Sequence, residues 1–189
     1  MFKCAHISDI HFRSLKRHEE YEIVFQKYFE KLKKIENLDA IFIGGDIVHS
    51  KTQGITPEII DILSWWFTSL ADIAPTHIIL GNHDGLILNE TRQDAISPII
   101  SALNNKNLKL YKKSGVYPCF TPNHDTTINW CVFSCFDEKS WSNVKPVENE
   151  INIACFHGAV TGSKTDINWE LEGEVKSSFF DGFDFGFLG

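Results

Sequence analysis

The sequence lacks the features of a secreted or membrane protein. No apolar run approaches the roughly 20 residues that a helix needs to cross a bilayer. The N-terminus has no basic segment followed by an apolar stretch and a cleavage site. Cysteines are few and odd in number, five in 189 residues, which is typical of reduced thiols inside a cell rather than of a disulfide framework. We therefore expect a cytoplasmic protein with no membrane partner.

Positive charge is also scarce. Lysine and arginine total 18 against 25 aspartates and glutamates, a net charge of −7, which argues against a strongly basic nucleic-acid-binding protein. This argument weakens if the carboxylates gather at a metal site, because bound divalent cations reverse the local charge. The charge balance therefore leaves the partner open. The 43% hydrophobic content is that of a globular protein, and the length fits one domain.

The first half of the sequence alternates between short apolar runs and amphipathic helices. Apolar residues recur at helical spacing from Tyr21 to Ile35. Thr56-Pro57-Glu58 has the capping hydroxyl, early proline and acidic residue of a helix start, and we expect this helix to end near Leu70. A shorter helix is predicted at 97–104, and strands are predicted at 3–8, 40–43 and 76–80. Helical crossovers between buried strands indicate a largely parallel sheet.

The second half of the sequence has the pattern of strands joined by turns. Apolar runs predict strands at 108–111, 119–121, 128–136, 151–156 and 185–188. We expect these strands to form a second, more antiparallel sheet.

Four of the predicted strands are followed by residues that can bind a metal or transfer a proton. In chain order these residues are Asp9 and His11, then Asp46 after two glycines, then Asn82, His83 and Asp84 after Gly81, and finally His157. The carboxyl ends of strands in open α/β sheets form the ligand crevice, so these groups can converge. Each motif alone has an ordinary explanation as a turn or a solvated loop. Their order, each after an apolar run, predicts one shared site.

The predicted site offers oxygen and imidazole donors. Such donors suit manganese, iron or zinc better than a thiolate-selecting metal, and too few carboxylates converge for a calcium cage. Asp46 could place one carboxylate oxygen on each of two ions. Two metals about 3.5–4 Å apart form a clamp for displacement at phosphorus.

The motif order Asp-x-His, Gly-Gly-Asp, Gly-Asn-His-Asp and a later His-Gly resembles that of the calcineurin-like metallophosphoesterases, over essentially the whole chain. This resemblance implies an α/β fold with two packed mixed β-sheets flanked by helices, forming one metallophosphoesterase domain over residues 1–189. Within this superfamily, Ala5–His11 and Gly45–Ser50 are similar to SbcD-type nuclease subunits of double-strand-break repair complexes. The compact size would also suit a phage recombination endonuclease, which would act in the host cytoplasm.

The SbcD-like resemblance implies a DNA exo- and endonuclease that acts in DNA repair, recombination and replication. Its implied partners are DNA, an SbcC-like ATPase subunit and a second copy of the chain. Its implied cofactors are two divalent ions, most simply Mn²⁺, with Mg²⁺, Fe²⁺ or Zn²⁺ as alternatives.

The resemblance also assigns a role to each motif residue. Asp9 and His11 would ligate the first metal, Asp46 would bridge both metals, and Asn82 and His157 would ligate the second. His83 would act over the scissile phosphate, with Asp84 orienting its ring. His49 would help to hold the substrate phosphate, or would be only a surface residue.

One departure from the family is expected to matter. The family has a Gly-His-x-His motif that gives each metal a further histidine, and Phe187-Leu188-Gly189 resembles the strand and glycine before it. We therefore expect the chain to be truncated at its C-terminus, to bind metal weakly and to have little or no activity.

Two other functions stay open. A phosphatase or small-molecule phosphodiesterase of the same superfamily would use the same motifs, and the net charge of −7 favours it slightly. A non-catalytic scaffold that kept the fold but lost the metals is the third alternative. The intact set of motif residues argues against that scaffold.

Overall fold

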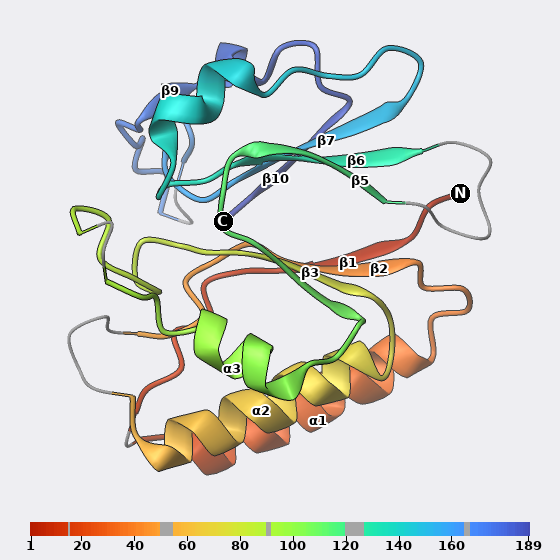
Figure 1. The fold of residues 1–189 in the computed structure, drawn as a ribbon, viewed down its shortest axis with the longest axis vertical. Helices are drawn as coiled ribbons and strands as arrows, with labels where there is room; N and C mark the ends of the chain where they lie inside the picture. Colours follow the sequence, from red (N-terminus) through yellow and green to blue (C-terminus); the bar gives the residue numbers. More distant parts are fainter. Residues whose placement is uncertain (15, 50–54, 90–91, 120–126, 165–166) are drawn as a thin grey trace.

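Two β-sheets stacked face to face form the centre of the molecule, with three α-helices beneath the first sheet, in a computed structural model (Figure 1). The structure describes residues 1–14, 16–49, 55–89, 92–119, 127–164 and 167–189. The first sheet has four parallel strands in the order β1-β2-β3-β4. These strands are β1 (Cys4–Ile7), β2 (Ala40–Ile43), β3 (Thr76–Ile79) and β4 (Leu108–Tyr111).

The helices that cover the first sheet are α1 (His18–Lys33), α2 (Pro57–Ala71) and α3 (Ser97–Leu103). Helix α1 has acidic residues in its first turn and basic residues in its last, which complements the helix dipole. The Thr56 hydroxyl caps α2 by accepting a hydrogen bond from the Ile59 amide, as its sequence predicted. Phe25 of α1 and Trp66 and Phe67 of α2 lie in the core beneath the sheet, together with Phe12 from the loop after β1.

The second sheet has the order β10-β7-β6-β5. Its strands are β5 (Gly115–Cys119), β6 (Ile128–Phe133), β7 (Ile151–Phe156) and β10 (Phe185–Leu188). This sheet is more antiparallel than the first, as predicted, but only through β5, which is antiparallel to β6, whereas β6, β7 and β10 are parallel. The long crossovers that parallel strands require run through short elements: η1 (Glu138–Asn143), β8 (Val160–Thr161), β9 (Val175–Lys176) and η2 (Ser177–Phe180).

Strand β5 also starts earlier than the sequence suggested. The predicted strand at 119–121 overlaps β5 only at Cys119, and residues 120 and 121 lie outside the described residues. Glycine and proline in Gly115-Val116-Tyr117-Pro118 disguised the strand. The proline is tolerated because β5 is an edge strand.

The core between the two sheets is aromatic. Phe42 of β2 stacks on Trp130 of β6 with ring centroids 5.2 Å apart, and the buried His77 ring lies 4.8 Å from the same tryptophan. The outer face of the second sheet is covered by Trp141, Phe179 and Phe180, which pack on Phe133 and Phe156. The predicted fold class, two packed sheets flanked by helices, is confirmed.

All five cysteines are free. Over the described parts of the chain, no helix is long and apolar enough to cross a membrane.

Candidate metal centre

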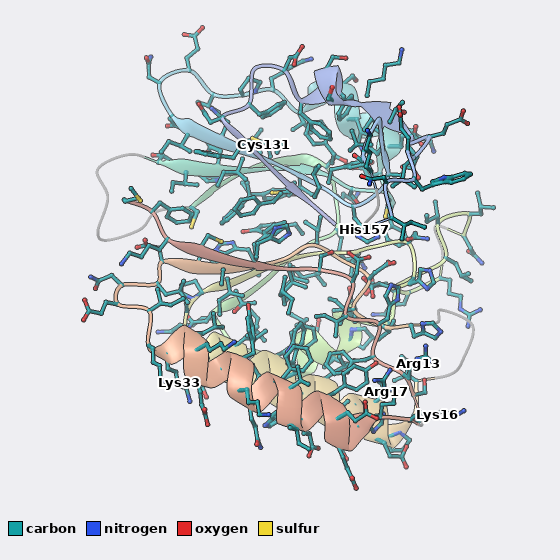
Figure 2. The ribbon with its side chains drawn as sticks, turned by 180° about the vertical axis from the view of Figure 1, so that it is seen from behind. Arg13, Lys16, Arg17, Lys33, Cys131 and His157 are labelled. Carbon is teal, nitrogen blue, oxygen red and sulfur yellow. The ribbon has the colours of Figure 1, made fainter. Side chains whose placement is uncertain are left out.

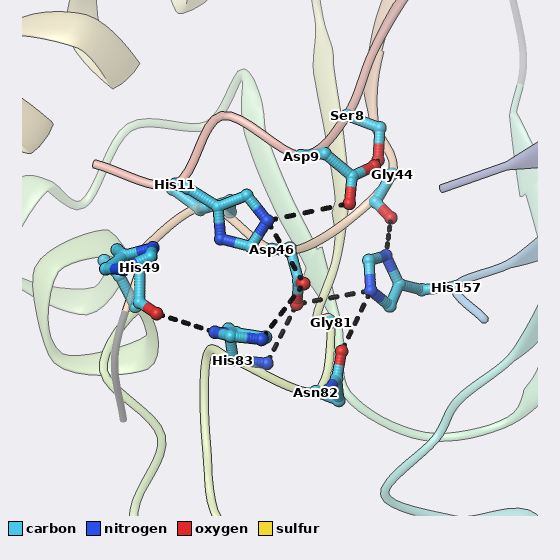
Figure 3. Close-up of polar contacts among 12 residues, drawn as sticks. Ser8, Asp9, His11, Gly44, Asp46, His49, Gly81, Asn82, His83 and His157 are labelled. Carbon is cyan, nitrogen blue, oxygen red and sulfur yellow. Dashed lines mark hydrogen bonds and ion pairs between the residues drawn. The ribbon is translucent and has the colours of Figure 1, made fainter. Parts of the chain in front are cut away.

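The predicted site residues meet at one edge of the molecule, where strands of both sheets end. Asp9 and His11 follow β1, Asp46 follows β2, Asn82 and His83 follow β3, and His157 follows β7. The strands β1, β2 and β3 are parallel, so their carboxyl ends lie side by side. His157 reaches the same place from the second sheet (Figures 2 and 3).

Asp46 is the centre of the cluster. Its Oδ1 lies 3.2 Å from His157 Nε2, and its Oδ2 lies 3.6 Å from His11 Nε2 and 4.0 Å from His83 Nε2. The ligand atoms form two groups, each within 4.8 Å, composed of His11, Asp46 and His83, and of Asp9, Asp46 and His157. Asp46 belongs to both groups, which is the arrangement that a carboxylate bridging two cations requires.

Asn82 completes the predicted set, because its Oδ1 lies 3.3 Å from His157 Nε2. His83 also lies in the cluster, because it shares one ligand group with His11 and Asp46.

The prediction that Asp84 orients the His83 ring is wrong. Asp84 is fully buried and accepts hydrogen bonds from the backbone amides of Ile47, Val48 and Gly81 at 2.8–3.0 Å. These bonds tie the loop after β2 to the loop after β3. The His83 ring is held instead by its Nδ1, which donates to the backbone carbonyl of His49 at 2.6 Å. The side chain of His49 lies beside that ring, with centroids 6.2 Å apart.

Unusual backbone conformations hold three of the predicted ligands. Asp9, His11 and Asp46 have φ values of 56°, 52° and 51°, in the left-handed region that side chains rarely adopt. Such strain concentrates at functional sites, where the surrounding structure enforces it. Here the two loops enforce it together, because the amides of Asp9 and His11 donate to the carbonyls of Gly45 and Asp46 at 3.1 and 3.0 Å.

Two glycines allow the close approach of the loops. A Cβ atom on Gly81 would collide with Oδ1 and the backbone nitrogen of Asp46, and one on Gly45 would lie 2.6 Å from the Gly81 nitrogen. Sequence reasoning treated these glycines as turn residues and missed this packing role. Their position directly before ligand motifs was the available signal.

The donor set fits bound cations. His157 Nδ1 donates to the Gly44 carbonyl at 2.8 Å, so in the neutral ring Nε2 carries only a lone pair. That lone pair faces oxygens of Asp46 and Asn82 at 3.2 and 3.3 Å. Several acceptor atoms pointing at one another need a cation or an extra proton between them. The His11 ring adds a buried Nδ1 with no hydrogen-bond partner in the described structure.

The charges of the cluster follow from the same contacts. Burial opposes ionisation of Asp46, but the hydrogen bond from His157 and the amide of His83 hold the pKa of Asp46 below its usual value. Burial likewise opposes charge on His157, yet the contact with Asp46 raises the His157 pKa. Burial raises the pKa of Asp84 to about 7, although three amide donors act in the opposite direction.

Comparisons with known proteins agree with this geometry. The family model described as Calcineurin-like phosphoesterase matches residues 2–186. The chain is also similar to "Uncharacterized protein R555" of Acanthamoeba polyphaga mimivirus, with 38% identity over 198 residues that cover 97% of the chain. The chain spans only 14% of the length of that viral protein.

Proposed function

Because this chain belongs to the family of calcineurin-like phosphoesterases, we propose that it hydrolyses phosphoesters with bound divalent cations and that its substrate is DNA. The hydrolysis part of this proposal rests on two ligand groups that share Asp46: one of His11, Asp46 and His83, and one of Asp9, Asp46 and His157. Two cations held there would bind the attacking and leaving oxygens and lower the pKa of a bound water molecule. Mn²⁺ is the proposed metal, because the donors combine carboxylates with imidazoles.

Two histidines at the cluster, His83 and His49, support a catalytic role. The His49 carbonyl fixes the proton of His83 on Nδ1, so Nε2 is the atom free to take up and deliver a proton. In its protonated form, His83 would donate that proton to the leaving oxygen. The side chain of His49, beside the His83 ring, would contact a phosphate oxygen.

Two observations support DNA as the substrate. The segments Ala5–His11 and Gly45–Ser50 resemble those of SbcD-type nucleases. In addition, Arg13, Lys16 and Arg17 follow the first motif and lie toward the same edge of the molecule as His157 (Figure 2). Arg17 is paired with Glu20 at 2.6 Å, so Arg13 and Lys16 are the side chains of this group that suit a polyanionic strand despite the net charge of −7.

The proposed partners rest on the SbcD-like resemblance alone. They are an SbcC-like ATPase subunit and a second copy of the chain, in a complex that acts in DNA repair and recombination. Gly189 lies against the cluster, because its amide donates to the Phe156 carbonyl at 3.0 Å and its backbone accepts from Gly158. We further propose that a histidine added after Gly189 would reach the metal centre.

The experiment is a comparison of substrates with Mn²⁺ present. We expect the chain extended by the expected Gly-His-x-His motif to cleave a labelled oligonucleotide, and Asp46→Ala in that extended chain to abolish cleavage. The control is Asp61→Ala, which removes an exposed carboxylate from α2. Cleavage of a phosphomonoester but not of DNA would contradict the nuclease proposal and identify a phosphatase, which the acidic net charge favours. Calorimetry on the extended chain that shows no Mn²⁺ binding would identify a scaffold.

A further inference from the structure

A cavity of about 860 Å³ lies next to the metal centre, and the proposed mechanism makes no use of it. Its apolar wall comes from Leu80, Ile87 and Phe136. Its rim carries four basic side chains, those of Arg92, Lys112, Lys113 and Lys139. The volume falls in the range of cavities that bind ligands of nucleotide or cofactor size.

The cavity and the metal centre share one loop. Leu80, Ile87 and Asn89 of this loop line the cavity, while Asn82 and His83 between them face the cluster. The loop is fastened to the far wall of the cavity, since Cys135 Sγ lies 3.6 Å from the Leu80 carbonyl oxygen. The Ala95 amide, next to the lining residue Asp94, donates to the Asp84 carbonyl at 2.8 Å. A group bound in the cavity would therefore lie against the same loop that carries His83.

The charge of the cavity is opposite to that of the whole chain. Four basic side chains face three acidic ones here, whereas the chain has a net charge of −7. Two of the acids are already engaged. Asp94 pairs with Lys112 Nζ at 2.7 Å and accepts from the amide and hydroxyl of Ser97. Asp137 accepts from the Ser114 amide and the Ser140 hydroxyl at 3.0 Å.

Arg92 and Lys113 are the basic side chains of the rim that the proposal uses. Arg92 and Lys113 are exposed, and among the described residues no carboxylate forms an ion pair with either. Glu138 is the third acid of the rim. Cations spread around an apolar floor match the chemistry of a nucleotide, whose phosphates lie around a flat base. A lone phosphate ion would make no use of the apolar wall.

We propose that this cavity receives a nucleotide of the DNA strand next to the scissile phosphate, with the base against Ile87 and Phe136 and flanking phosphates at Arg92 and Lys113. The inference rests on the proposed DNA substrate and goes beyond it by assigning a strand-binding subsite. The basic side chains of the cavity would also explain how a chain with a net charge of −7 binds a polyanion.

The test measures binding of a fluorescent single-stranded oligonucleotide by anisotropy over a range of salt concentrations. Arg92→Ala/Lys113→Ala should weaken binding roughly tenfold at 0.1 M salt and reduce the slope of log K against log[salt] by about 1.4, because two phosphate contacts are lost. Both side chains are exposed, so the variant should keep the wild-type circular dichroism and melting temperature.

The matched control is Lys31→Ala/Lys33→Ala, which removes the same charge from α1. Figure 2 places Lys33 at the end of α1 remote from the edge that carries His157. The control should leave the salt slope unchanged. Equal losses of oligonucleotide affinity in both variants, or no loss in either, would overturn the proposed subsite. Such a result would still leave the chain as a DNA-binding protein. If the wild-type chain bound no oligonucleotide at any salt concentration, the proposed DNA substrate itself would fail, and the subsite with it.

Discussion

The Nδ1 atom of His83 lies 2.6 Å from the backbone carbonyl oxygen of His49. The proposed acid is thus oriented by main chain, and the side chain of His49 stays available for another task. Because a carbonyl group survives any substitution at position 49, the two histidines can be separated by mutation.

His83→Ala should lower kcat for oligonucleotide cleavage by about 10²–10⁴, the usual contribution of a positioned acid. His49→Ala keeps the carbonyl that holds His83, so it should mainly raise KM and lower kcat much less. Steady-state kinetics on both variants, with Mn²⁺ present, check this difference. Equal losses of kcat in the two variants would contradict the division of roles.

Asp84→Ala should destabilise the protein strongly. The substitution leaves three buried amides, of Ile47, Val48 and Gly81, without their acceptor, and each costs about 1–3 kcal/mol. We expect a loss of roughly 3 kcal/mol or more in the free energy of unfolding in urea. The exposed Asp61→Ala should change it by less than about 0.5 kcal/mol. A small effect at Asp84 would mean that water replaces the carboxylate.

Gly81→Ala should disrupt the metal centre. The added methyl group would collide with Asp46 and approach His157 Nε2 to 2.8 Å, so the two loops would have to separate. Mn²⁺ affinity, measured by calorimetry, should fall at least about tenfold. Gly115→Ala is the control, because its new Cβ would meet no atom closer than 3.4 Å. Unchanged affinity in the Gly81 variant would show that the loops have more room than the structure gives them.

Stability should fall in acid because of His77, far from the metal centre. Burial between the sheets lowers the pKa of His77 from 6.5 to about 3. The unfolded chain therefore binds a proton that the folded chain excludes, and stability is lost as the pH falls from 6.5 toward 3. Between pH 6.5 and 4.5, His77 alone should lower the free energy of unfolding by about 2 to 3 kcal/mol.

The check on His77 is the pH dependence of unfolding. His77→Gln cannot titrate, so its free energy of unfolding should depend less steeply on pH over this interval. Identical pH profiles for the two proteins would show that the ring is protonated inside the fold.

Metal binding should stabilise the fold. A cation that binds only the folded state raises its stability by RT ln(1 + [L]/Kd), about 2.7 kcal/mol at 100 times Kd. Mn²⁺ should therefore raise the melting temperature, and Asp46→Ala should remove the shift because Asp46 belongs to both ligand groups. A melting temperature that rises equally in the variant would place the cation elsewhere.

Much of the fold and of the site was predictable because both depend on local patterns. Helical spacing, the Thr56 cap and apolar runs predicted the first sheet and its helices, and the polar residues after each strand predicted which side chains converge. The crossovers of the second sheet lacked such a signal. They run through 3₁₀ turns and two-residue strands, which have no clear periodicity.

The unpredicted parts of the site depend on main-chain atoms. The carbonyls of His49 and Gly44 and the amides around Asp84 have no sequence signature, because every residue carries them. The family pattern therefore predicted that His83 and Asp84 belong to the site, but it did not predict the main-chain groups that hydrogen-bond to their side chains.

Asp46, which belongs to both ligand groups, follows a strand of one sheet, and its imidazole neighbour His157 follows a strand of the other. A folding intermediate in which only the first sheet has formed would contain Asp46 but would lack His157, so it could not bind a pair of ions. Metal binding should thus come late in folding, after Phe42 and Trp130 have packed against each other. The rate of cation binding during refolding would then report when the two sheets pack together.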